Sequence, residues 1–302
     1  MAPEQRSLTA KLANEIEGAA DLFSSLWPGY EEPLNTLPPH RQRTSVNKLA
    51  GYAHFLGMPT AKGDPAAVAF RRVKAWQKRI GPLRDCDVMR QWTDKFRDLA
   101  GSAADDAANA FDSALLARRT LLLQPIRLDA RGVVGAQTRV ALQVLLSDFG
   151  RALERVEAAG TFNSMNALAT VATPWSAALD VLRSAQEDTL LHAFRVTNKR
   201  LRFVLELLAE TEPDPDRREL LKSRAKVAAQ THTALGNLSD LHVLRGALRL
   251  ERAKWGEERR GLEDSAAELE LARARLEAEN FRLWFDCWPR ISDPAFLGDL
   301  LG

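Results

Sequence analysis

The chain has 302 residues, of which 45% are hydrophobic and 27% charged, a balance typical of folded globular proteins. This composition excludes a disordered chain, a collagen-like chain and a disulfide scaffold, and no apolar run is long enough to predict a transmembrane helix. The length fits two ordinary domains or one large one. The net charge of +2 says little about partners. Cys86 and Cys287 form no CxxC pair and the start does not resemble a secretory signal, so we expect a cytoplasmic protein.

Apolar residues recur at spacings of three and four along nearly the whole chain, which predicts an all-α fold. Pro125 and the segment Gly132 to Gly135 are predicted to interrupt the middle of the chain. A division near residue 160 separates two predicted bundles, residues 1–160 and 161–302, which together form one domain. The predicted helices cover residues 7–26, 40–57, 65–80, 84–100, 103–123, 136–158, 163–185, 187–210, 216–235, 238–258 and 260–283.

Two short motifs occur twice in the same order along the chain. Gly81-Pro-Leu-Arg-Asp matches Gly236-Asn-Leu-Ser-Asp in its glycine, leucine and aspartate. His40-x-x-Arg, followed by Lys48, matches His192-x-x-Arg, followed by Lys199-Arg200. The histidine and the glycine are 41 residues apart in the first copy and 44 in the second. This similarity predicts an internal duplication, with two similar helical bundles related by a pseudo-twofold axis.

The predicted helix that begins near His192 carries a basic stripe. His192, Arg195, Lys199 and Arg202 fall on one face, Arg200 lies at its flank, and the opposite face is apolar. We expect no acidic residue one turn away to neutralise this stripe. The stripe is either a solvated cationic face or a surface that binds a polyanion.

A second acid-free basic segment covers residues 71–84. Its like charges repel one another at helical spacings, and an anion would relieve that repulsion. Arginine offers a planar fork and lysine a mobile charge, so a mixture suits a repeating anion. The cations of this segment are Arg71, Arg72, Lys74, Lys78, Arg79 and Arg84, and further cations come from Arg43, Lys48, Lys222, Arg224 and Lys226.

Asp85 and Asp240 each follow a glycine by four residues, in predicted turns between helices. We interpret them as helix caps or as partners of a nearby arginine, in preference to catalytic carboxylates. A structural and a ligand-binding role stay equally open for the histidines that open the basic stripes, His40 and His192. The other three histidines, His54, His232 and His242, are interpreted as structural. No phosphate loop, metal-binding motif or nucleophile–base pair is present, so we expect binding rather than catalysis, with no metal and no cofactor.

The stripe His192-Ala-Phe-Arg-Val-Thr-Asn-Lys-Arg-Leu-Arg and the two glycine–aspartate segments resemble the CHAD family, the conserved-histidine α-helical domain. The resemblance spans residues 40 to 245. It implies two four-helix bundles in a pseudo-twofold arrangement, with basic residues lining a central groove or pore. It also implies binding of long-chain inorganic polyphosphate and, for some members, a location at polyphosphate granules.

The first copy of the motif departs from the family pattern. Asn47 stands where the second copy has Lys199, and Ala50 stands where it has Arg202. The basic segment of residues 71–84 is a candidate to compensate for this loss. The predicted polyphosphate-binding residues are His40, Arg43, Lys48, Arg71, Arg72, Lys74, Lys78, Arg79, Arg84, His192, Arg195, Lys199, Arg200, Arg202, Lys222, Arg224 and Lys226. The predicted structural turn residues are Gly81, Asp85, Gly236 and Asp240.

The main hypothesis is a non-enzymatic polyphosphate-binding protein. The alternatives are a general polyanion or nucleic-acid binder, an accessory module of a phosphohydrolase, and a helical adaptor that receives an acidic protein. A nucleic-acid binder would need aromatic side chains among the cations, and residues 71–84 offer Trp76 alone, for which we favour a core or groove-rim role.

Overall fold

The computed structural model describes residues 3–32, 35–58, 61, 63–159, 164–184, 188–255 and 262–301. The described residues form helices and no strands, which confirms the all-α prediction. The α-helices are α1 (Pro3–Ser25), α2 (Leu37–Phe55), α3 (Pro65–Arg79), α4 (Gly81–Ala100), α5 (Asp105–Arg131), α6 (Val133–Ala159), α7 (Ser164–Ser184), α8 (Asp188–Thr211), α9 (Pro215–Arg252), α10 (Leu262–Ile291) and α11 (Ala295–Leu301), with short 3-10 helices at Pro28–Glu31 and Gly101–Ala104.

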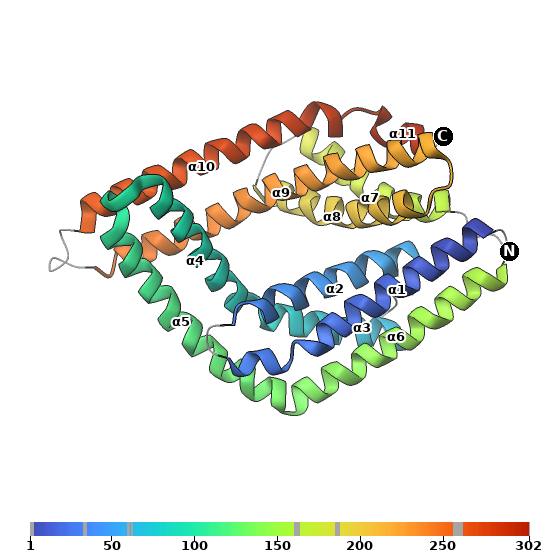
Figure 1. The fold of residues 1–302 in the computed structure, drawn as a ribbon, viewed down its shortest axis with the longest axis horizontal. Helices are drawn as coiled ribbons and strands as arrows, with labels where there is room; N and C mark the ends of the chain where they lie inside the picture. Colours follow the sequence, from blue (N-terminus) through green and yellow to red (C-terminus); the bar gives the residue numbers. More distant parts are fainter. Residues whose placement is uncertain are drawn as a thin grey trace.

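The helices form two layers that join at one end (Figure 1). Helices α1, α2, α3 and α6 pack together on one side, and α7, α8, the first half of α9 and the end of α10 pack on the other. Helices α4 and α5 lie across one end and pack against the second half of α9 and the first half of α10. Helix α2 faces α8 at the centre, where the Phe203 ring lies against the backbone of Gly51.

One apolar core runs through both layers. It begins at Leu8 in α1 and reaches Leu300 in α11, and a second core fills the end where α4, α5, α9 and α10 meet. The predicted division near residue 160 lies outside the described residues, and the helices on either side of it contribute to the same core. Each basic helix is therefore held in place along its apolar face, which fixes where its charged face points.

Two helices begin with the same local signal. The Asp64 carboxylate accepts the backbone N–H of Ala66 at 2.8 Å and caps α3, whose first residue is Pro65. The Asp214 carboxylate accepts the backbone N–H of Asp216 at 2.9 Å and caps α9, whose first residue is proline as well. Aspartate before proline suits a helix start because the carboxylate accepts free backbone N–H groups of the first turn, and proline has no N–H at a position where one would lack a helical partner.

Two predicted interruptions are wrong. Helix α9 continues through Gly236, and α5 continues through Pro125 to Arg131. Each break costs about 1 to 3 kcal/mol in an isolated helix. The residues beyond each one, such as Leu238 and Ile126, are buried in the core, and this packing keeps the helical path. The sequence also missed α11 and the extension of α10 to Ile291.

No helix in the described part of the chain is both long and apolar enough to cross a membrane. Cys86 and Cys287 are both buried and free.

Candidate functional site

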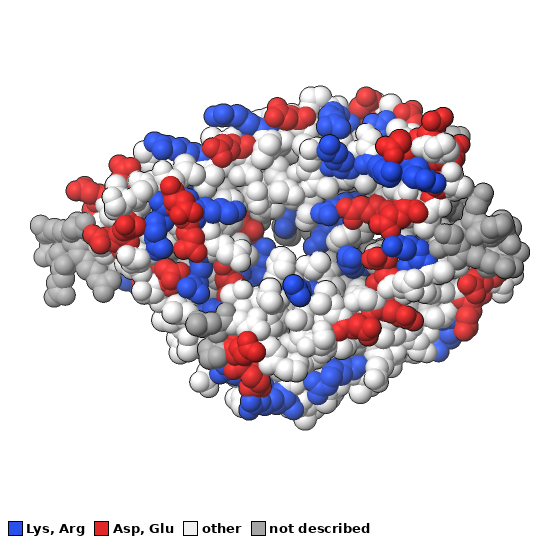
Figure 2. Space-filling model, viewed as in Figure 1, with Lys and Arg blue, Asp and Glu red and all other residues white. Residues whose placement is uncertain are grey.

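Four cations from three helices meet at the centre of the molecule. Arg43 comes from α2, Arg84 from α4, and Arg195 and Lys199 from α8; we call these four residues the central cationic cluster. They are close enough for each charge to act on the others, because Arg195, Arg43 and Arg84 all lower the pKa of the Lys199 ammonium. Figure 2 shows Lys and Arg side chains gathered around a recess in the middle of one face, between the two layers.

Burial makes the central cationic cluster electrostatically costly. Desolvation is the largest cause that lowers the pKa of Arg43, Arg195 and Lys199; neighbouring cations lower it further, and Asp240 opposes the shift at the two arginines. The pKa of Lys199 falls to about 7. Cations that are half-buried beside one another need a counter-charge, because neither water nor a paired acid compensates them fully.

The protein supplies part of that counter-charge through aspartate. Arg84 donates from Nη1 and Nη2 to the two carboxylate oxygens of Asp240, at 3.2 and 3.4 Å, and from Nη1 to Asp85 at 3.3 Å. Both aspartates lie inside their helices, so they are arginine partners and not helix caps. No ion pair of Arg43, Arg195 or Lys199 forms among the described residues.

The two glycines of the repeated motif make room for the arginines. A Cβ on Gly81 would lie 3.1 Å from Nη1 of Arg43, and a Cβ on Gly236 would lie 3.4 Å from Nε and Nη2 of Arg195. Gly81 lies at the junction between α3 and α4, as predicted for a turn between helices, whereas Gly236 lies inside α9, so the predicted turn role is wrong at Gly236. Glycine lies here because each guanidinium packs directly on the helix backbone.

The histidines lie around the cationic residues. The pKa of His40 is lowered by burial and then by Arg84 and Lys199, and the pKa of His232 falls to about 3 for similar reasons. Burial likewise lowers the pKa of His54, helped by Arg200 and Lys74. Neutral imidazoles in such places act as hydrogen-bond donors or acceptors and not as cations.

The sequence missed His232 as a site residue. The signal that marks it is its register, because it precedes Gly236 by four residues, as Gln77 precedes Gly81. Gln77 donates to Asn47 at 3.0 Å in the first copy, whereas burial, then Arg195 and Lys199, lower the pKa of His232 in the second.

Several predicted site residues are paired with acids instead. Lys48 binds Glu15 at 3.1 Å, and Arg202 binds Glu206 at 2.6 Å. The expectation that no acid lies one turn from the stripe is therefore wrong at Arg202. The same pairing occurs for Arg79 with Asp129, Lys222 with Glu219 and Arg224 with Asp299.

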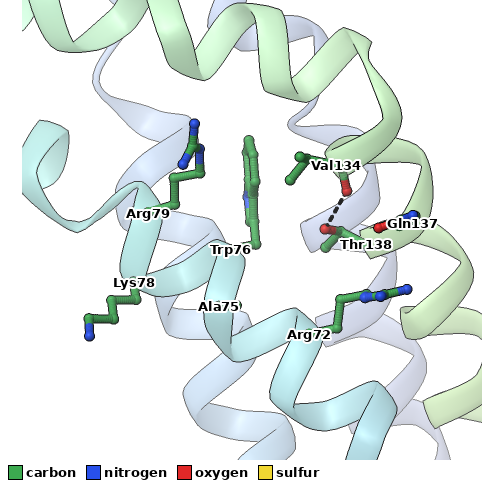
Figure 3. Close-up of a pocket in the computed structure, with 8 residues that line it drawn as sticks. All are labelled: Arg72, Ala75, Trp76, Lys78, Arg79, Val134, Gln137 and Thr138. Atoms are coloured by element: carbon green, nitrogen blue, oxygen red, sulfur yellow. Dashed lines mark hydrogen bonds between the residues drawn. The ribbon is translucent and has the colours of Figure 1, made fainter.

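The cations of α3 divide between two faces of the helix. Burial, and then the charge of Arg200 of α8, lower the pKa of Lys74, so Lys74 lies near Arg200 and extends the cationic surface from the centre. Arg72 and Arg79 instead border a cavity of about 410 Å³ between α3 and α6 (Figure 3), where they lie on either side of Trp76. Lys78 points away from the Trp76 ring in the same view. Arg71 and Lys226 are exposed, and Arg71 borders a smaller cavity beside His54.

Two residues of the basic stripe on α8 line a further cavity. His192 and Arg195 line it together with His242, Glu277 and Phe281. No group of three or more His, Cys, Asp or Glu side chains in the described part of the chain is placed to hold a metal ion.

Arg195 of α8 packs against Gly236 of α9, and both residues lie within the part of the chain that matches a known family. The family model of the CHAD domain matches residues 40–249, more than half of the chain. The chain belongs to the CHAD family. No curated protein and no solved structure matched the chain. The matched residues include the whole central cationic cluster of this CHAD protein, and they exclude α1, α10 and α11.

Proposed function

We propose that this CHAD protein binds long-chain inorganic polyphosphate, without turning it over, at the central cationic cluster. The observation that carries the proposal is the meeting of Arg43, Arg195 and Lys199 at one place without ion pairs among the described residues. A polyanion would supply the missing counter-charge and release its own condensed counterions. The family is associated with polyphosphate, which supports the same ligand.

The path of the ligand is proposed to follow α8. Arg195 and Arg202 act on the charge of Lys199, so the three lie along one side of the helix, and Arg200 lies near Lys74 of α3. A linear chain with one charge per unit can move along such a row, because no unit needs an individual pocket. The cations that pair with acids are proposed to border this path and to contribute less.

We further propose that the chain consists of two bundles related by internal duplication. The two glycine–arginine contacts, Gly81 with Arg43 and Gly236 with Arg195, support this idea because they join equivalent positions of the repeat. The matching starts of α3 and α9 support it as well. We also propose a cytoplasmic location at polyphosphate granules, because the family is associated with polyphosphate.

The test is direct binding of long-chain polyphosphate, tripolyphosphate and single-stranded RNA at two salt concentrations. We expect the tightest binding for long-chain polyphosphate, with an affinity that falls as salt rises. Phosphate release is measured in the same samples, and sustained release would contradict the non-enzymatic proposal. Equal affinity for RNA would favour the second candidate, a general polyanion or nucleic-acid binder. The exposed ring of Phe281, in the cavity beside His192 and Arg195, supports this candidate because bases stack on exposed aromatic rings.

Polyphosphate affinity is expected to fall about tenfold between pH 6 and pH 8. Free Lys199 has a pKa near 7, and a bound polyanion stabilises its charged form and raises that pKa. Above pH 7 the free Lys199 side chain is mostly neutral, so binding must take up a proton, and the affinity falls as the pH rises. Titrations at pH 6, 7 and 8 measure the effect. The Lys199→Met variant is the comparison, and an equally steep profile in that variant would contradict the assignment to Lys199.

A further inference from the structure

The cavity beside the central cationic cluster differs from the cluster in its chemistry. It lies between α8, α9 and α10 and has a volume of about 150 Å³. One water requires roughly 10 to 15 Å³ by the same kind of measure, so the cavity has room for a small organic group. Most of its wall is apolar and includes Leu191, Leu235 and Leu238. A phosphate chain gains nothing from an apolar wall, whereas a planar organic group does.

An aromatic ring at this cavity is already held in position. Phe281 of α10 lines the cavity and is 40% exposed. Its ring stacks on that of Phe285, with 6.4 Å between centroids and 27° between planes. A preordered, partly exposed ring is a stacking platform, because little side-chain entropy remains to be lost when a second planar group binds.

The polar groups of the cavity differ from one end to the other. Arg195 belongs to both the cavity and the central cationic cluster, and its buried Nε has no hydrogen-bond partner in the described structure. On the α10 side lies the Glu277 carboxylate, which accepts from Arg273 Nη1 at 2.7 Å. A carboxylate repels phosphate and accepts from an amino group, so the two ends favour different parts of one ligand.

We propose that this cavity takes the base of a nucleoside triphosphate whose phosphates reach Arg195 and the central cationic cluster. The base stacks on Phe281, and its amino group faces Glu277. The proposal rests on the anion-binding role proposed for the cluster. It adds nucleotides as a second class of ligand, which carries a base that polyphosphate lacks. ATP and tripolyphosphate differ by the nucleoside, so the two ligands separate the cavity from the cluster.

The experiment measures the affinities of ATP, tripolyphosphate and long-chain polyphosphate for the full chain, without divalent cations. ATP is expected to bind about tenfold more tightly than tripolyphosphate, within the range expected for one stacked base. Phe281→Ala should remove that advantage and change tripolyphosphate affinity less than about twofold. Phe281→Tyr should keep the advantage, because it keeps the ring.

Leu283→Ala is the matched control, since Leu283 lies on the same helix, is 52% exposed and is not part of the cavity wall. It should leave both affinities unchanged. Equal binding of ATP and tripolyphosphate, or an ATP advantage that survives Phe281→Ala, would overturn the proposal. If polyphosphate binds while ATP shows no advantage, only the base site fails; if neither polyphosphate nor ATP binds, the proposed anion-binding function fails with it.

Discussion

Replacing Arg195 and Lys199 together with alanine is expected to weaken polyphosphate binding at least about 100-fold. A hydrogen bond to a charged group contributes about 1.5 to 3 kcal/mol, and every 1.4 kcal/mol is tenfold in affinity. Both side chains are largely buried and form no ion pair in the described structure, although Asp240 partly compensates the charge of Arg195. Titration of long-chain polyphosphate at low salt measures the loss.

The control for this variant removes two cations from another surface. Arg151 and Arg155 are exposed on α6, at the outer side of the first layer, and their double alanine variant loses the same formal charge. It is expected to keep affinity within about threefold, the effect of a distant, screened charge. Equal losses in the two double variants would show that overall charge, and not the central cationic cluster, determines binding. Circular dichroism checks that both variants remain helical.

Replacing Arg119 with methionine is expected to lower the free energy of unfolding by about 3 to 5 kcal/mol. Arg119 is 1% exposed, donates from Nε to Asp87 at 2.5 Å and from Nη2 to the backbone oxygen of Asn35 at 2.8 Å. It joins α5, α4 and the segment before α2. Burial raises the pKa of the Asp87 carboxyl, and Arg119 opposes that shift. Removing the guanidinium leaves a buried acid and a backbone oxygen without their partner.

Urea unfolding followed by circular dichroism measures this cost. The double variant Asp87→Ala with Arg119→Met should be destabilised by less than the sum of the single variants, because it leaves no uncompensated charge. Arg131→Ala is the control: it removes another arginine of α5 that pairs with an acid, Glu31, but whose side chain is 68% exposed. Its cost should stay below about 1 kcal/mol. A similar small cost for Arg119→Met would contradict the structural role given to the buried pair.

The helices were predictable because their signals are local. Apolar residues at helical spacing and the Asp–Pro starts of α3 and α9 depend on neighbours within a few residues. The failures at Pro125 and Gly236 have the opposite origin. There a local breaker is overridden by burial against helices that are distant in the sequence, and no short window contains that information.

The cationic residues were predictable as types but not as a site. The basic segment of residues 71–84 reads as one stripe, yet Lys74 lies near Arg200 whereas Arg72 borders a cavity against α6. The acid partners were equally hidden, because the carboxylate that binds Arg84 belongs to Asp240, more than half the chain away. Charge pairing depends on which helices pack together, and that depends on the apolar faces.

By itself, the sequence determined that this chain is helical, that its basic residues recur in a repeated motif, and that they resemble those of the CHAD family. Only the tertiary structure decided which cations meet, how far burial lowers the pKa of Lys199, and that Phe281 lies beside Arg195. The physical reason is the range of the forces involved. Helix formation is set by residues three and four apart, whereas desolvation and charge coupling are set by every side chain that the fold brings within a few ångströms.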